Sequence, residues 1–247
     1  MRKKILLVDD SKTFLMYAGL LLKRMNYTVI NAASGIEALR ILNDMTPDLV
    51  MSDLHMETID GLKLLKHIRT KEQTSKVPVV MASIESGTSV IEQCKSSGCC
   101  DYLVKPINIH QLYEVINKCL FQQEGYYRKS IRVPFRKPVI ISYNRVQHEL
   151  HSENISESGI YIKTKTPFIT GSEVILTIAL EDNVEVTLAG IVVYNNKATN
   201  GQISQPPGMA IEFTELTEEN SLSLRIFIEH TLAADIFDNL EGNTLSN

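Results

Sequence analysis

The sequence predicts a chain of two parts: an α/β domain on a doubly wound five-stranded parallel sheet, then a small antiparallel β-barrel closed by a helix. In the first half, five short apolar segments alternate with five amphipathic ones, which is the pattern of repeated βαβ units. In the second half, six short strand-like segments are separated by Gly, Asn and Pro, as in small barrels. A length of 247 residues allows two domains, each with its own core.

The elements of the first half follow one another in strict alternation. Lys4 to Val8 is a short apolar run typical of a buried parallel strand, and Ser11 can cap the helix that follows. The expected strands are 4–8, 27–31, 48–54, 77–83 and 101–104. The expected helices are 11–24, 34–45, 60–70, 88–97 and 109–121.

In the second half the strands are shorter and often alternate apolar with polar residues. They are expected at 139–143, 147–154, 159–164, 173–180, 184–193 and 209–213. Residues 214–218 then begin a closing helix, in which we expect Leu222, Ile226 and the region of Thr231 to form the apolar face. The tail from 238 to 247 is expected to be flexible.

Composition and charge exclude several classes of protein. Apolar residues at 44% and charged residues at 22% are those of a globular protein, and the net charge of −4 argues against general binding to nucleic acid. No apolar run is long enough for membrane insertion, so we expect a cytoplasmic protein. Its four cysteines are expected to be free thiols rather than a disulfide or a zinc site; they are Cys94, Cys99, Cys100 and Cys119.

Polar side chains stand at the carboxyl ends of several predicted strands. Asp9 and Asp10 follow the first strand, Asp53 ends the third, Ser83 ends the fourth and Lys105 follows the fifth. In a doubly wound sheet these ends form the ligand-binding edge. Any one of them alone is as readily a solvated loop residue, but five such residues at the ends of four strands indicate a site.

Three carboxylates at one edge repel one another unless a cation is present, and an all-oxygen cluster suits Mg²⁺. Asp53 could then accept a phosphoryl group, with Ser83 and Lys105 neutralising its oxygens. The sequence therefore predicts a magnesium-dependent phosphoacceptor site.

Residues 1–121 resemble a CheY-like receiver domain of two-component response regulators. The resemblance rests on Asp9-Asp10, Asp53, Ser83, Tyr102 within DYLVKP, and Lys105-Pro106. It implies phosphorylation of Asp53 by a sensor histidine kinase, a magnesium ligand from the backbone carbonyl of His55, and Tyr102 as the switch aromatic. It leaves open whether the receiver forms a homodimer.

The segment from Tyr126 to Arg136 is rich in cations and joins the two halves. It places Arg128, Arg132 and Arg136 four residues apart. If the segment were helical, they would share one face; if it were extended, Pro134 would keep it from the centre of a sheet.

A polar hook, Asn154-Ile-Ser-Glu-Ser-Gly159, lies between two predicted strands. Alone, this pattern is most often an ordinary turn, in which Gly159 permits a left-handed conformation or a close approach. Together with upstream arginines, which bind phosphates bidentately, it points to a ligand site.

The pair RxxxR and NxSxxG resembles the PilZ domain, over residues 124–234. By this resemblance Arg128, Arg132, Asn154, Ser156 and Gly159 bind cyclic di-GMP. Lys129 and Arg136 would be secondary contacts. The linker, residues 122–136, would then also carry part of the ligand site.

We therefore expect a response regulator, not an enzyme, with a receiver phosphorylated on Asp53 and a PilZ output domain that binds cyclic di-GMP. The alternative is a phosphorylation-dependent adaptor whose PilZ domain binds an unknown downstream protein and no nucleotide. A transcription regulator is disfavoured because the acidic second half shows no helix-turn-helix pattern.

Overall fold

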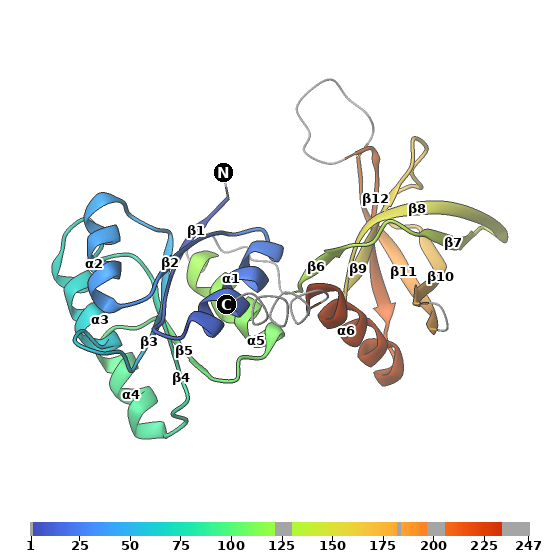
Figure 1. Ribbon diagram of the computed structural model, residues 1–247. Helices are drawn as coiled ribbons and strands as arrows, with labels where there is room; N and C mark the ends of the chain where they lie inside the picture. The colour runs from blue at the N-terminus through green and yellow to red at the C-terminus, as the bar shows by residue number, and fades with distance from the viewer. Residues whose placement is uncertain (1, 122–129, 182–183, 197–205, 234–247) are drawn as a thin grey trace, which may run out of the picture. The chain divides into compact units, whose positions relative to one another are not determined.

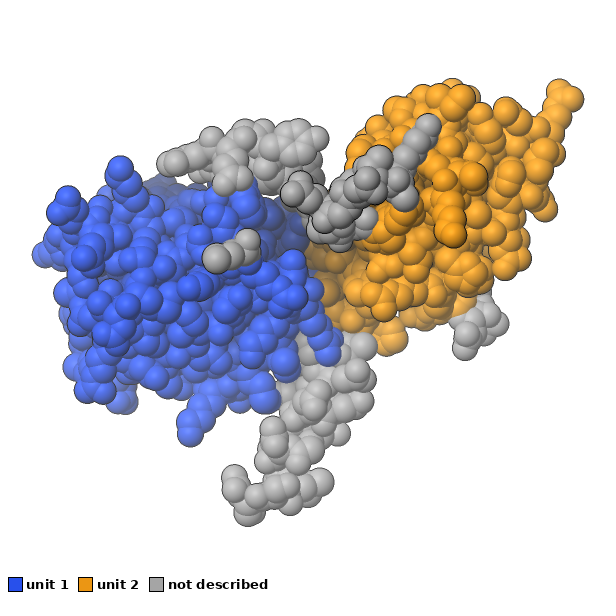
Figure 2. Space-filling model, turned by 90° about the horizontal axis from the view of Figure 1, so that it is seen from above, with its two compact units in different colours: residues 1–129, 235–247 blue, residues 130–234 orange. Residues whose placement is uncertain are grey.

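The computed structural model describes the chain except for residues 1, 122–129, 182–183, 197–205 and 234–247 (Figure 1). The chain divides into two compact units (Figure 2), the first comprising Met1–Lys129 and Asp235–Asn247 and the second Ser130–Ala234. The predicted division into an α/β part and a β part is confirmed.

The first unit contains a five-stranded parallel sheet in the order β2-β1-β3-β4-β5. The strands are β1 (Lys4–Val8), β2 (Thr28–Ala32), β3 (Leu49–Asp53), β4 (Val79–Ser83) and β5 (Asp101–Val104). The helices are α1 (Lys12–Arg24), α2 (Gly35–Asp44), α3 (Gly61–Thr70), α4 (Thr88–Ser96) and α5 (Ile109–Phe121). The elements agree with the sequence prediction to within a few residues at their ends.

Helices cover both faces of this sheet, as the near-continuous apolar strands require. One core cluster joins α2, α3 and α4 to one face through residues such as Leu42, Leu64 and Cys94, while α1 and α5 lie on the other face (Figure 1). Ser11 accepts a hydrogen bond from the Phe14 amide, so the predicted cap of α1 is confirmed. The winding reverses between β1 and β3, which brings the carboxyl ends of these strands together.

The second unit is a closed antiparallel barrel. Its ring runs β8-β7-β10-β11-β12-β9 and closes where β9 pairs with β8. The strands are β6 (Arg132–Pro134), β7 (Pro138–Tyr143), β8 (Val146–Ser156), β9 (Gly159–Lys163), β10 (Glu173–Glu181), β11 (Val184–Asn196) and β12 (Gly208–Glu215). The helix α6 (Glu218–Ala233) follows them.

Strand β6 was not among the expected strands. Among the described strands it pairs only with β8, so Pro134 lies in an edge strand, where a residue without an N–H does not break the hydrogen-bond ladder. The extended alternative for the cationic segment is therefore correct over Arg132–Pro134.

The predicted apolar face of the closing helix is wrong. Leu222 and Ile226 are each 56% exposed, whereas Leu224, Ile228 and Leu232 are buried. Phe227 packs edge-on against Phe135, with ring centroids 5.4 Å apart, which ties α6 to the segment after β6. Both sets of apolar residues repeat every four positions, so periodicity alone could not choose between them.

The expectation of four free thiols is also wrong. Cys100 and Cys119 form a disulfide, and Cys94 and Cys99 remain free and buried. The two bonded cysteines are 19 residues apart in sequence, but β5 and α5 bring their Cα atoms to 6.2 Å. This separation lies within the range that a disulfide spans, and only the tertiary fold creates it.

Candidate functional site

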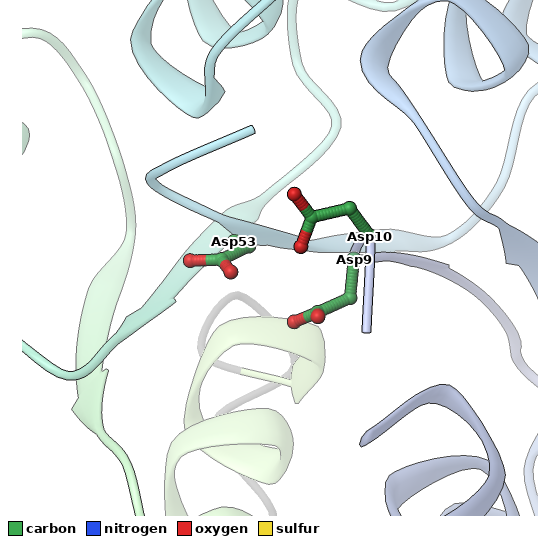
Figure 3. Close-up of side chains that lie close together, drawn as sticks. All are labelled: Asp9, Asp10 and Asp53. Carbon is green, nitrogen blue, oxygen red and sulfur yellow. The ribbon is translucent and has the colours of Figure 1, made fainter. Parts of the chain in front are cut away.

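Three carboxylates meet at the carboxyl edge of the parallel sheet (Figure 3). Asp9 and Asp10 follow β1, Asp53 ends β3, and each offers one oxygen that lies within 4.8 Å of the others. Asp9 is fully buried, while Asp10 is exposed. The predicted cluster is therefore present, and its all-oxygen donors and spacing fit a small hard cation such as Mg²⁺.

Lys105 bridges two of these carboxylates. Its Nζ lies 2.6 Å from Asp9 Oδ2 and 2.9 Å from Asp53 Oδ2. The Lys105 ammonium also lies 4.2 Å from the centroid of the Phe14 ring on α1, at cation–π distance. The peptide bond between Lys105 and Pro106 is cis.

Burial and Lys105 act on Asp9 in opposite directions. Burial raises the pKa of Asp9 above its ordinary value, while the hydrogen bonds from Lys105 and from the Ser11 amide work to lower it. Burial is the larger cause. Asp9 therefore lies where a bound cation or the Lys105 ammonium must compensate for the lost hydration of its charge.

Close backbone packing holds Asp53 in place. A Cβ at Gly61, the first residue of α3, would lie 2.3 Å from the Asp53 carbonyl oxygen, so only glycine fits there. The His55 amide donates a hydrogen bond to Asp53 Oδ1 at 3.2 Å. Sequence analysis assigned no role to Gly61 or Phe14, because a steric contact and a ring beneath an ammonium depend on how distant segments pack.

Ser83 and Tyr102 lie beside the acidic cluster. Ser83 is fully buried at the end of β4, and its hydroxyl accepts a hydrogen bond from the Glu85 amide. Tyr102 is also buried, and its hydroxyl donates to the Glu85 carbonyl at 2.9 Å. Glu85 further pairs with His55 through their side chains, 2.8 Å apart. The loop after β4 is thus connected both to Tyr102 and to the loop after β3.

The barrel brings together part of the second predicted site. In the ladder, Arg132 on β6 is opposite Ser156 on β8, and Ser156 is opposite Gly159 on β9. Arg132 is exposed and Asn154 is half-buried. Arg128 and Lys129 lie outside the described residues.

Ser156 and Gly159 shape the turn between β8 and β9. The Ser156 hydroxyl donates to the Gly159 carbonyl at 3.1 Å, and the side chain is buried. A Cβ at Gly159 would lie 2.5 Å from the Ile211 carbonyl oxygen on β12. Sequence analysis offered two reasons for a glycine at position 159, a left-handed conformation or a close approach of the backbone, and the structure shows the close approach.

A cluster of three charged side chains lies farther along β8 and β9 from this turn. Glu153 accepts hydrogen bonds from the Arg136 guanidinium at 3.1 and 3.3 Å, and Lys163 Nζ lies 3.1 Å from its other carboxylate oxygen. The pairing of β8 with β9 shifts between Ser152 and Asn154, so Glu153 is the bulged residue. Sequence analysis missed Glu153 and Lys163, because a bulge is set by strand pairing and not by a motif.

The structure thus shows two domains: a doubly wound α/β domain with an acidic edge, and a closed antiparallel barrel. Residues 5–117 match the response regulator receiver domain, and residues 126–230 match the PilZ domain. The chain thus consists of a receiver domain followed by a PilZ domain, which are both regulatory families.

The chain is also similar in sequence to proteins that are named as regulators. The chain is 37% identical over 111 residues to the two-component response regulator ARR11 of Arabidopsis thaliana, and 35% identical over 121 residues to the Regulator of RpoS of Escherichia coli. These matches cover 44% and 48% of this chain but only 21% and 35% of the relatives' own lengths. Among solved structures, the chemotaxis response regulator CheY4 of Vibrio cholerae is 29% identical, with a TM-score of 0.47, over 49% of this chain and 100% of that one.

Within the part of the chain that the structure describes, no helix is long and apolar enough to cross a membrane.

Proposed function

We propose that this chain is a two-component response regulator that accepts a phosphoryl group on Asp53 from a sensor histidine kinase. The observation that supports this most strongly is the position of Asp53, where its carboxylate meets Asp9, Asp10 and the Lys105 ammonium at one sheet edge. The site combines a nucleophilic oxygen with groups that neutralise negative charge, which is what phosphoryl transfer needs.

In this proposal an Asp53 carboxylate oxygen attacks the phosphorus of a phosphohistidine. The new O–P bond forms as the N–P bond breaks, and the released imidazole takes up a proton from water. The Lys105 ammonium, already 2.9 Å from Asp53 Oδ2, follows the charge onto the phosphoryl oxygens, and the Ser83 hydroxyl donates to one of them. Asp9, Asp10, Asp53 and the His55 backbone carbonyl would hold Mg²⁺, which neutralises phosphoryl oxygens when bound.

The test is phosphorylation of the purified full chain by a small phosphodonor, acetyl phosphate, with Mg²⁺. We expect intact-mass spectrometry to show one added phosphoryl group, and the Asp53→Asn variant to show none. An equal yield of phosphorylated Asp53→Asn variant would refute the assignment. So would the absence of phosphorylated wild-type chain when Mg²⁺ is present and the buffer contains no metal chelator.

The second part of the proposal is that the PilZ domain binds cyclic di-GMP. Arg132, Asn154 and the Gly159 turn lie on neighbouring strands, and the sequence places Arg128 and Lys129 just before them. Guanidiniums bind phosphate oxygens bidentately, and an exposed Arg132 can reach a ligand. Ser156 would support the turn from within, and Arg136 would give a secondary contact.

Calorimetric titration with cyclic di-GMP tests this claim. We expect micromolar or tighter binding by the wild-type chain and a loss of about a hundred-fold or more in the Arg128→Ala, Arg132→Ala double variant. Lys165→Ala, which removes an exposed cation just after β9, is the control and should bind normally. No binding by the wild-type chain would leave the adaptor function, in which the PilZ domain contacts a downstream protein.

We also propose that the two inputs are coupled through residues 126–136, because the linker between the receiver (1–121) and the PilZ domain (124–234) carries the predicted ligand arginines. Coupling between two sites is reciprocal, so a phosphoryl mimic on Asp53 must change nucleotide affinity by the same factor as nucleotide changes binding of the mimic. Equal affinities for cyclic di-GMP with and without beryllofluoride would disprove the coupling and leave both binding claims intact.

A further inference from the structure

The disulfide joins two elements of the receiver domain at a defined place. Cys100 directly precedes β5, and Cys119 lies in the last turn of α5, two residues before the helix ends at Phe121. Beside it, Lys118 Nζ pairs with Asp101 Oδ2 at 2.8 Å, so consecutive residues on each element form two adjacent links. The Cys100 amide also donates to the Val79 carbonyl at 2.7 Å, which fixes its backbone to β4.

The four cysteines differ in their access to solvent. Cys100 and Cys119 are half-buried, whereas Cys94 and Cys99 are buried in the core. Burial raises the pKa of the Cys99 thiol to about 11, and it also raises the pKa of Cys94. Because the thiolate is the reactive form, the raised pKa makes Cys94 and Cys99 slow to attack the disulfide. This holds for Cys99 even though it is next to Cys100 in sequence.

Contacts that do not involve sulfur keep the bonded pair aligned. The Lys118–Asp101 ion pair holds the end of α5 against β5, and the hydrogen bond from the Cys100 amide to the Val79 carbonyl holds Cys100 against β4. These contacts do not depend on the state of the sulfurs, so reduction would leave the two thiols close to each other and ready to re-form the bond. Partly exposed disulfides are those that exchange with solvent thiols.

We propose that Cys100 and Cys119 are a reversible redox modification site that locks the end of α5 to the start of β5. Oxidation removes two hydrogen atoms from the thiols: with oxidised glutathione, the pair becomes a disulfide and two molecules of reduced glutathione are released. A dithiol reductant reverses the step by forming its own disulfide.

The position of this lock decides what it can regulate. Tyr102, the predicted switch residue, is two residues after Cys100 on β5, and α5 ends nine residues before the Ser130 that begins the second unit. The oxidised form therefore restrains the element from which the chain leads toward the PilZ domain. This inference stands on the disulfide and does not require that the PilZ domain bind a nucleotide.

Peptide mapping tests the pairing. Trypsin cuts after Lys95 and Lys118 but not at Lys105-Pro106, so Cys119 separates from the peptide that carries Cys99 and Cys100. After oxidised glutathione and thiol blocking, we expect the peptide 96–118 linked to 119–128, with Cys94 and Cys99 alkylated. The same link should form in Cys99→Ala and be absent in Cys100→Ser. A link through Cys99, or a disulfide between two chains, would overturn the proposal.

Stability and exchange measurements test the lock. The disulfide closes a loop of 19 residues, for which we expect oxidation to raise the Tm of the receiver by about 10 °C. Hydrogen exchange at the end of α5 should slow by about ten-fold on oxidation. The Cys119→Ser variant, in which a serine replaces a half-buried thiol, should show neither effect. Equal Tm and exchange rates for oxidised and reduced wild type would refute the lock.

Discussion

The Nζ of Lys105 lies 2.9 Å from Asp53 Oδ2 and bridges it to the buried Asp9. This lysine holds two carboxylates of different strands together, because its single charge offsets part of their mutual repulsion. The same contact ties the loop after β5 to the ends of β1 and β3.

Replacing Lys105 by Met should destabilise the receiver by about 3 kcal/mol, because two carboxylates would be left close together without a counter-charge. Adding Mg²⁺ should recover part of this loss, since ligand binding to the folded state stabilises it. Urea unfolding with and without Mg²⁺ measures both effects. Lys12→Met, which removes an exposed lysine from the start of α1, serves as the control. A variant as stable as the wild type would show that the bridge contributes nothing.

Replacing Gly61 by Ala should destabilise the receiver by about 2 kcal/mol, because the new methyl would overlap the Asp53 carbonyl oxygen 2.3 Å away. The displaced backbone should also slow phosphorylation of Asp53. Denaturant unfolding and the rate of modification by acetyl phosphate are the measurements. Gly87→Ala is a matched control, since no atom lies within 4 Å of the Cβ it would add. If both variants lose the same stability, close packing is not the cause.

The stability of the PilZ domain should depend on pH through Glu153. The hydrogen bond from Lys163 is the largest cause that lowers the pKa of Glu153 below its ordinary value of 4.5. A carboxyl whose pKa is lowered in the folded state stabilises that state above the ordinary value and loses the contribution as the pH falls through the lowered one. Because Arg136 is largely exposed, the gain at neutral pH should be below about 1 kcal/mol.

The measurement is the difference in Tm between the wild type and Glu153→Gln, taken at a series of pH values. We expect the wild type to be the more stable at pH 7 and the difference to shrink below pH 4.5. A difference that stays constant, or grows on acidification, would contradict the ionic origin of the effect.

Two isoleucines only two residues apart on α6 should differ sharply when truncated. Ile228 is fully buried, so Ile228→Ala should cost about 3 kcal/mol through lost burial and a cavity. Ile226 is 56% exposed, so Ile226→Ala should change stability by no more than about 0.5 kcal/mol. Chemical unfolding of the two variants compares their free energies of unfolding directly. Equal losses of stability would mean that α6 buries a different face from the one described.

The amino-acid sequence by itself determined the alternation of elements, the barrel strands except β6, and the acidic edge of the parallel sheet. It could do so because these features are local: apolar periodicity marks the elements, and parallel strands in this winding must end at one edge. Because Asp9, Asp53 and Lys105 each stand at such a strand end, the sequence could predict that they are neighbours.

Only the tertiary structure decided the partner of Cys100, the buried face of α6 and the contacts of Glu153. Each depends on the rotation or register of one element against another, over 19 residues in the case of Cys100 and Cys119. Leu222 and Ile226 have the same spacing as Leu224 and Ile228, so periodicity cannot tell which pair packs inward. Long-range contacts fix the rotation of a helix and the register of a strand. The packing of α6 against Phe135 therefore sets which face of α6 is buried, and the bulge in β8 sets the contacts of Glu153.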